Sequence, residues 1–151
     1  MEIKKELWGT APESGKEIYK YHVINASGAK VVLSSVGASI VSIWVPDKDG
    51  KLADVALGYD DFNSYITDAA CIGKCPGRFA NRIAKGRFVL DGVEYNLPIN
   101  NACNHLHGGP QGFQTKVWES RTVGDAVEFM YISEDGEAGY PGTLKAVVHY
   151  E

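Results

Sequence analysis

The chain is built from short runs of alternating apolar and polar residues, rich in β-branched and aromatic side chains and separated by turn residues. Its 17 glycines recur between these runs. Side chains two residues apart lie on the same face of a strand, so each run can bury one face and expose the other. Short strands with turn signals at close spacing predict an all-β sandwich or barrel.

The strands predicted in this way cover residues 31–36, 40–45, 54–58, 86–90, 93–97, 127–132 and 144–150. Residues 47–50 and the Asp91-Gly92 pair are predicted as hairpin turns, because Asp and Gly tolerate the turn dihedrals. One short helix is expected, from Asp60 to Tyr65 or Ile66. No internal repeat, linker or low-complexity tract interrupts the pattern.

Size and charge exclude several classes of protein. The 151 residues suffice for one domain, and the net charge of −4 argues against a nucleic acid or an anionic membrane as partner. No apolar run approaches transmembrane length, and the charged start, Met1 to Glu6, does not resemble a signal peptide. The odd count of 3 cysteines predicts free thiols and hence a cytoplasmic protein.

One stretch without acidic residues carries five cations: Lys74, Arg78, Arg82, Lys85 and Arg87. A solvated basic face is one interpretation, and a ligand-facing arginine is the other. Arg82 follows Asn81, so a guanidinium and a carboxamide stand side by side and offer fixed donors plus one acceptor. This pair suits a neutral polyhydroxylated ligand, because each hydroxyl seeks both a donor and an acceptor.

The segment 104–109, Asn-His-Leu-His-Gly-Gly, reads as a loop that presents an imidazole to a ligand. Its glycines allow the backbone to approach that ligand closely. A metal site is an alternative, because His105 and His107 would share one face of a strand. The nearest acidic residue is only Glu119, so we expect no metal. A zinc site would be the other metal arrangement, from Cys71, Cys75 and Cys103 with His105.

The segments 77–88 and 104–109, followed by Gly112-Phe113 and Trp118-Glu119, closely resemble the aldose 1-epimerase (galactose mutarotase) family. Supporting similarities lie at residues 45–50, 54–60 and 135–142. The resemblance runs in order along nearly the whole chain, and its two central motifs together are highly specific. It implies an antiparallel β-sandwich of the galactose mutarotase type, with the sugar in a cleft on one face.

The resemblance also implies an activity, the interconversion of the α and β anomers of aldoses such as galactose and glucose, without a cofactor. In the family a glutamate takes the proton of the C1 hydroxyl and a histidine protonates the ring oxygen. By position, Asn81, Arg82 and His107 match residues that hold the sugar. His107 would bind near the reacting end, which makes it the candidate catalytic residue, whereas His105 is interpreted as structural.

The family's general acid and general base lie after the segment that matches Tyr150. We therefore expect residues 1–151 to be the N-terminal portion of a single, truncated mutarotase-like β-sandwich domain that is inactive alone. The strand 144–150 is expected to be an unpaired edge and the surface for self-association. The alternative is a non-catalytic carbohydrate-binding domain on the same scaffold.

Overall fold

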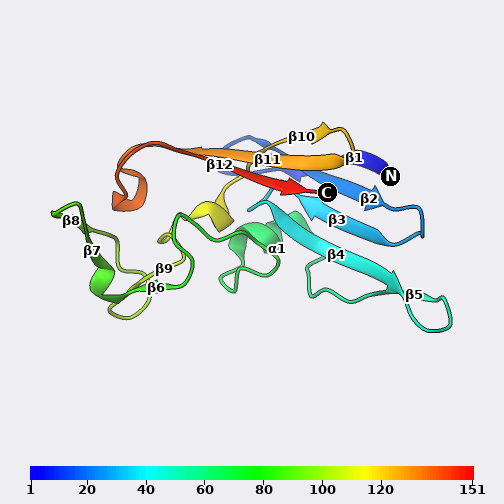
Figure 1. Cartoon of the computed structure of the whole chain (residues 1–151), viewed down its shortest axis with the longest axis horizontal. Coiled ribbons are helices and arrows are strands. Elements are labelled where there is room, and N and C mark those ends of the chain that lie inside the picture. Colours follow the sequence, from blue (N-terminus) through cyan, green and yellow to red (C-terminus); the bar gives the residue numbers. More distant parts are fainter.

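Two antiparallel sheets lie one above the other in the computed structural model, which describes residues 1–151 (Figure 1). The larger sheet has the strand order β1-β2-β3-β4-β5 and the smaller the order β10-β11-β12. Neighbours in each sheet are also neighbours in sequence, so the chain builds both sheets by successive hairpins. The strands of the sheets are β1 (Glu2–Thr10), β2 (Glu17–Ile24), β3 (Lys30–Ser34), β4 (Ser39–Pro46), β5 (Leu52–Asp54), β10 (Glu119–Val123), β11 (Ala126–Ser133) and β12 (Leu144–Tyr150).

The core lies between the two sheets and is rich in aromatic rings. Tyr21 of β2 and Phe129 of β11 are fully buried and meet edge to face, with ring centroids 5.7 Å apart. Tyr150 of β12 packs on the same Phe129 at 6.0 Å. Such edge-to-face pairs add to the free energy gained by burying apolar area. The buried members of this core are Tyr21, Leu33, Ala38, Phe113, Trp118, Val127 and Phe129.

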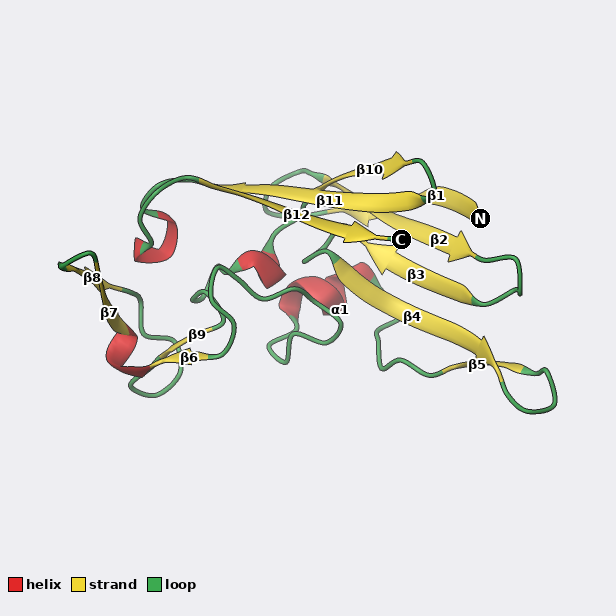
Figure 2. Cartoon of the chain, viewed as in Figure 1, coloured by secondary structure: helices red, strands yellow, loops and turns green.

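A second, smaller core lies where the helix α1 (Phe62–Thr67) packs against the larger sheet. The helix begins at Asp61, whose side chain accepts a hydrogen bond from the backbone N–H of Ser64 at 2.9 Å and so caps the first turn. Tyr65 is its one buried residue, and it joins the apolar cluster that contains Ile18 and Val36. Figure 2 shows this helix below the sheet layers, beside β4. None of the helices has the length and apolar character that a membrane crossing requires.

Most predicted strands are confirmed, but the strand predicted at 54–58 is wrong. The strand β5 lies earlier and ends at Asp54, whose Oδ1 accepts hydrogen bonds from the backbone N–H groups of Ile43 and Ala56. A side chain that bonds its own backbone two residues on favours a turn, so the chain leaves the sheet there. The sequence pattern does not predict β1, β2 and β10, because charged residues interrupt the alternation of apolar and polar positions in these strands.

The strand β12 pairs with β11 alone, so its other edge is open. The period-two rule correctly assigns its faces. Ala146, Val148 and Tyr150 pack against the core, whereas His149 is exposed beside Glu128 on the outer face.

The segment between the two sheets reaches away from the sandwich and carries both motifs of interest (Figure 2). It contains one two-stranded ladder, of β6 (Arg82–Ile83) with β9 (His105–Leu106), and one hairpin, of β7 (Arg87–Leu90) with β8 (Val93–Asn96). Short 3-10 turns complete the chain: η1 (Ala84–Gly86), η2 (Phe113–Thr115) and η3 (Glu137–Gly139).

Candidate functional site

The two motifs singled out from the sequence lie side by side in the structure. Arg82 is paired with Leu106 and Ile83 with His105 across the β6–β9 ladder. The ladder is only two residues long on each strand. It nevertheless sets the register that brings the segment 77–82 to the loop 104–109.

Asn81 and His107 are joined by a reciprocal pair of hydrogen bonds. The backbone N–H of Asn81 donates to Nδ1 of His107 at 2.9 Å, and the backbone N–H of His107 donates to the carbonyl of Asn81 at 3.1 Å. Both residues have left-handed backbone conformations, with φ of 69° and 52°. Such conformations cost free energy in residues other than glycine and gather at functional sites, where surrounding contacts maintain them. The mutual hydrogen bonds are those contacts here.

The bond to Asn81 fixes the tautomer of His107. A backbone N–H can only donate, so Nδ1 of His107 must be the unprotonated nitrogen. In the neutral ring the proton therefore resides on Nε2, which makes no hydrogen bond within the chain. His107 thus has a free N–H donor at Nε2.

Arg82 is exposed, and part of its guanidinium is held in place by two asparagines. Nε donates to Oδ1 of Asn101 at 2.8 Å, and one terminal nitrogen lies 3.3 Å from Oδ1 of Asn81. The other terminal nitrogen makes no bond within the chain. A planar guanidinium held at two of its nitrogens can present the third to a hydroxyl group of a ligand.

The role of Asn101 was missed in the sequence, although the run Asn100-Asn101 just before the loop was a signal. Asparagine commonly builds turns through its side chain. Asn100 does so here: its Oδ1 accepts from the N–H of Leu106 at 2.7 Å and its amide donates to the carbonyl of Leu106 at 3.0 Å. The two asparagines therefore hold the loop and Arg82, respectively.

The interpretation of the basic stretch as a solvated face is wrong for two of its members. Lys74 is buried and forms an ion pair with Asp68 at 3.5 Å. Arg78 is half-buried and donates to Ser133, Glu134 and Pro141. Arg82, Lys85 and Arg87 are exposed, as a solvated face requires.

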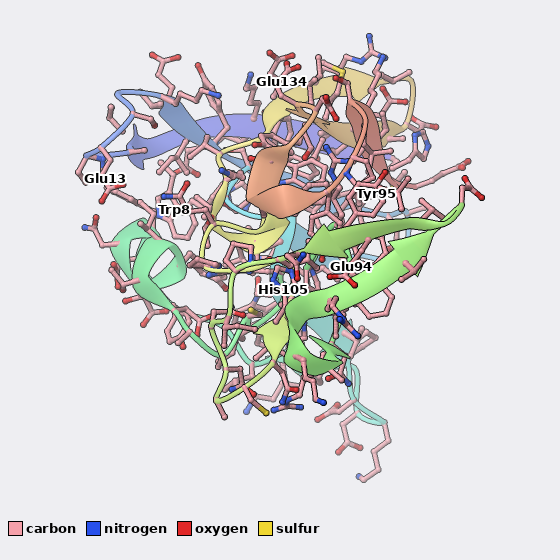
Figure 3. The ribbon with its side chains drawn as sticks, turned by 90° about the vertical axis from the view of Figure 1, so that its left-hand side faces the viewer. Trp8, Glu13, Glu94, Tyr95, His105 and Glu134 are labelled. Carbon is pink, nitrogen blue, oxygen red and sulfur yellow. The ribbon has the colours of Figure 1, made fainter.

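His105 is completely buried and both of its ring nitrogens have partners. Nδ1 lies 2.7 Å from the carbonyl of Pro98, so it carries the proton, and Nε2 lies 2.8 Å from the hydroxyl of Tyr140. Burial raises the pKa of Tyr140 to about 12, so its hydroxyl remains a donor near neutral pH. His105 is therefore structural, as expected. Figure 3 shows it at the centre of this end of the molecule, behind the hairpin that carries Tyr95.

The two imidazoles do not share one strand face. The left-handed backbone of His107 interrupts the period-two alternation that would have aligned them. The three cysteines are free, and no group of three or more His, Cys, Asp or Glu side chains is gathered anywhere in the structure. The two metal arrangements considered from the sequence are therefore not formed.

The three tryptophans belong mainly to packing. Trp118 is buried in the main core, and its indole N–H donates to the carbonyl of Phe113. Trp8 and Trp44 are half-buried, and each indole is covered by a lysine ammonium 4.8 Å from the ring centroid, Lys20 and Lys30 respectively. None of the three offers an uncovered ring beside His107.

Asn81, Arg82 and His107 thus form one polar surface at the junction of the ladder and the loop. Asn81 and Arg82 are exposed and His107 is half-buried, so the three groups make one wall rather than an enclosed pocket. Their chemistry is that of hydrogen-bond donors with one carboxamide acceptor. This set fits a neutral, hydroxyl-rich ligand.

Comparisons with known proteins agree with these motifs. The family model for aldose 1-epimerase matches residues 19–151. The galactose mutarotase of Bos taurus is 40% identical over 148 residues, which is 98% of this chain and 43% of that protein. The aldose 1-epimerase of Escherichia coli K12 is 39% identical over 127 residues, 83% of this chain and 37% of that protein. The chain therefore spans less than half the length of these relatives and covers their N-terminal part.

Solved structures show the same fold. A galactose 1-epimerase from Lactobacillus acidophilus superposes with a TM-score of 0.83 at 25% identity, covering 99% of this chain and 44% of that one. An aldose epimerase homologue from C. elegans gives a TM-score of 0.81 at 36% identity, covering 85% of this chain and 40% of that one. The antiparallel sandwich predicted from the sequence is confirmed.

Proposed function

The chain belongs to the aldose 1-epimerase family, and on that premise we propose that it supplies one wall of an aldose-binding site. The contact between Asn81 and His107 carries the proposal. It leaves Nε2–H of His107 as a free donor, and the side chain of the same Asn81 contacts Arg82. A pyranose offers a ring oxygen and several hydroxyls to such a set.

Each side chain has a distinct role in this proposal. Arg82 donates to hydroxyls on the sugar ring, and the carboxamide of Asn81 supplies both a donor and an acceptor. His107 donates from Nε2 near the reacting end of the sugar. A donor placed there stabilises negative charge that develops on oxygen as the ring opens. His107 is thus the one candidate catalytic residue among the residues of this chain.

Mutarotation also needs a base for the C1 hydroxyl and an acid for the ring oxygen. We propose that these two groups belong to the part of the family fold that this chain does not span. Residues 1–151 are then the N-terminal portion of a single sandwich domain.

The test is binding and turnover measured on the same sample. Galactose titrated into the chain and followed by NMR should shift the signals around His107, and His107→Ala should weaken binding about fivefold, as expected for the loss of one hydrogen bond. His149→Ala, at an exposed histidine of β12, is the matched control and should leave binding unchanged. Equal binding by the His107→Ala variant would refute the role of the imidazole.

Polarimetry of freshly dissolved α-D-galactose tests catalysis separately. We expect no acceleration by the 151-residue chain. A clear acceleration that His107→Ala abolishes would overturn the assignment of the acid and base to another part of the fold. Binding without acceleration is also the result expected of a carbohydrate-binding domain on this scaffold, so a longer chain of the same protein, assayed alike, separates the two.

Two further properties complete the proposal. The three free cysteines are compatible with a reducing compartment, and we infer a cytoplasmic location. The open edge of β12 is the surface that we expect to pair with another chain. Light scattering that shows a monomer at every concentration would argue against such self-association.

A further inference from the structure

A chain of contacts, made of hydrogen bonds and of the peptide link between Tyr140 and Pro141, connects the turn between β11 and β12 to the loop that carries His107. Its members are Arg78, Tyr140 and His105, none of which faces the proposed ligand. We propose that Tyr140 and His105 are positioning residues for His107, with Arg78 holding Tyr140 in place. The proposal rests on the proposed function, because His107 is the group being positioned.

The first step is the attachment of the turn to Arg78. The guanidinium donates to Oγ of Ser133 at 2.8 Å and to the carbonyls of Ser133, Glu134 and Pro141 at 2.8 to 3.0 Å. These four acceptors stand at the two ends of the turn, so one side chain closes it. Arg78 lies only three residues before Asn81, which ties the turn to the segment that holds the proposed site. Figure 3 shows this turn, marked by Glu134, above His105.

The second step is the contact between Tyr140 and His105. The hydroxyl of Tyr140 lies 2.8 Å from Nε2 of His105, and the ring centroids are 5.4 Å apart in an edge-on arrangement. The carbonyl of Pro98 holds the other nitrogen, so the imidazole is fixed at both ends. Both residues are more than nine-tenths buried, where an unpaired polar group is costly. The ring of His105 consequently has one orientation.

The third step leads from His105 to His107. His105 is paired with Ile83 across the ladder, and the loop folds back onto its ring: a Cβ at Gly109 would lie 3.0 Å from Cε1 of His105. The backbone on both sides of His107, at His105 and at Gly109, is therefore held against a ring of fixed orientation. A rotation of His105 would move the backbone of His107 and stretch its bond to Asn81.

The test is Tyr140→Phe, which removes the hydroxyl and retains the ring. In slightly alkaline solution the imidazole nitrogen shifts of His107 report its tautomer and its bond to Asn81 without any sugar. We expect these shifts to change or broaden in Tyr140→Phe. Tyr95→Phe is the matched control, because Tyr95 stacks on the neighbouring Phe88 and its hydroxyl makes no hydrogen bond in the chain. His107 shifts identical to those of the original chain in a folded Tyr140→Phe variant would overturn the proposal.

A second variant and an affinity measurement complete the test of the positioning role. If Tyr140→Phe does not fold, Ser133→Ala removes one acceptor of Arg78 and is judged by the same His107 signals. Galactose affinity should fall about fivefold in Tyr140→Phe, the equivalent of about 1 kcal/mol. A changed His107 spectrum in a chain that binds no galactose would refute the proposed function and leave the positioning role intact.

Discussion

Gly108 is the residue whose substitution should disturb the candidate site most sharply. It has φ of +79°, and a Cβ built on it would lie 1.5 Å from the carbonyl oxygen of Gly77 and 2.3 Å from its carbon. Ordinary van der Waals contact begins at 3.4 Å. Gly108→Ala therefore forces two backbone segments apart by almost 2 Å, at the point where the motif 77–82 meets the loop 104–109.

The expected cost has two parts. An L-residue in the left-handed region costs about 1–2 kcal/mol. Overpacking of a close contact costs about 1–3 kcal/mol more, because backbone has no alternative rotamer into which it can retreat. We expect Gly108→Ala to lower the free energy of unfolding by about 2–5 kcal/mol. In a chain that remains folded, the Asn81–His107 contact should be the first to change.

Gly92 supplies a matched control. It has the same φ of +79°, but no atom lies within 4 Å of its added Cβ. Gly92→Ala therefore carries the conformational cost without the collision and should lower stability by only about 1–2 kcal/mol. Denaturant titration of the two variants under identical conditions gives the difference directly. Equal losses for Gly108→Ala and Gly92→Ala would refute the claim that close approach of the two backbones shapes this site.

Asn101→Ala should weaken galactose binding several-fold by releasing Arg82. Asn101→Asp keeps the acceptor oxygen and should restore binding. Equal galactose affinities of Asn101→Ala and the original chain in calorimetry would exclude a role of Asn101 in holding Arg82. Lys74→Met should cost about 3 kcal/mol in denaturant titration because it breaks a buried pair, whereas Lys48→Met, at an exposed pair, should change stability by less than about 1 kcal/mol. Burial acts to raise the pKa of Glu137, but hydrogen bonds from Ser133, Tyr131 and Lys116 outweigh it and lower the pKa. The stabilisation that the ionised carboxyl contributes is therefore lost as the pH falls below the ordinary range of a glutamate. Glu137→Gln should reduce the pH dependence of the free energy of unfolding in this acidic range. An unchanged pH dependence would contradict the lowered pKa of Glu137.

The fold class and the two hairpins at residues 47–50 and 91–92 could be predicted from the sequence alone. Alternation of apolar and polar residues is a local property, and it correctly predicted β4, β11 and β12 and the hairpin of β7 with β8. It failed at β1, where Lys4 and Lys5 interrupt the apolar pattern and burial of one face is decided by the neighbouring strand. Propensity is overridden by tertiary context in such strands.

Local chemistry in the sequence also indicated Asn81, Arg82 and His107, because their side-chain types and the adjacent glycines are legible without a structure. How these groups are held depends on contacts between segments far apart in the sequence. The tautomer of His107 depends on a backbone N–H that lies 26 residues away in sequence, and the guanidinium of Arg82 on an asparagine 19 residues away. Arg78 and Arg82 are the same residue type, but their neighbours in space make Arg78 a half-buried clamp on the β11–β12 turn and leave Arg82 exposed. Hydrogen bonds act over about 3 Å, so their partners are set by packing and not by spacing along the chain.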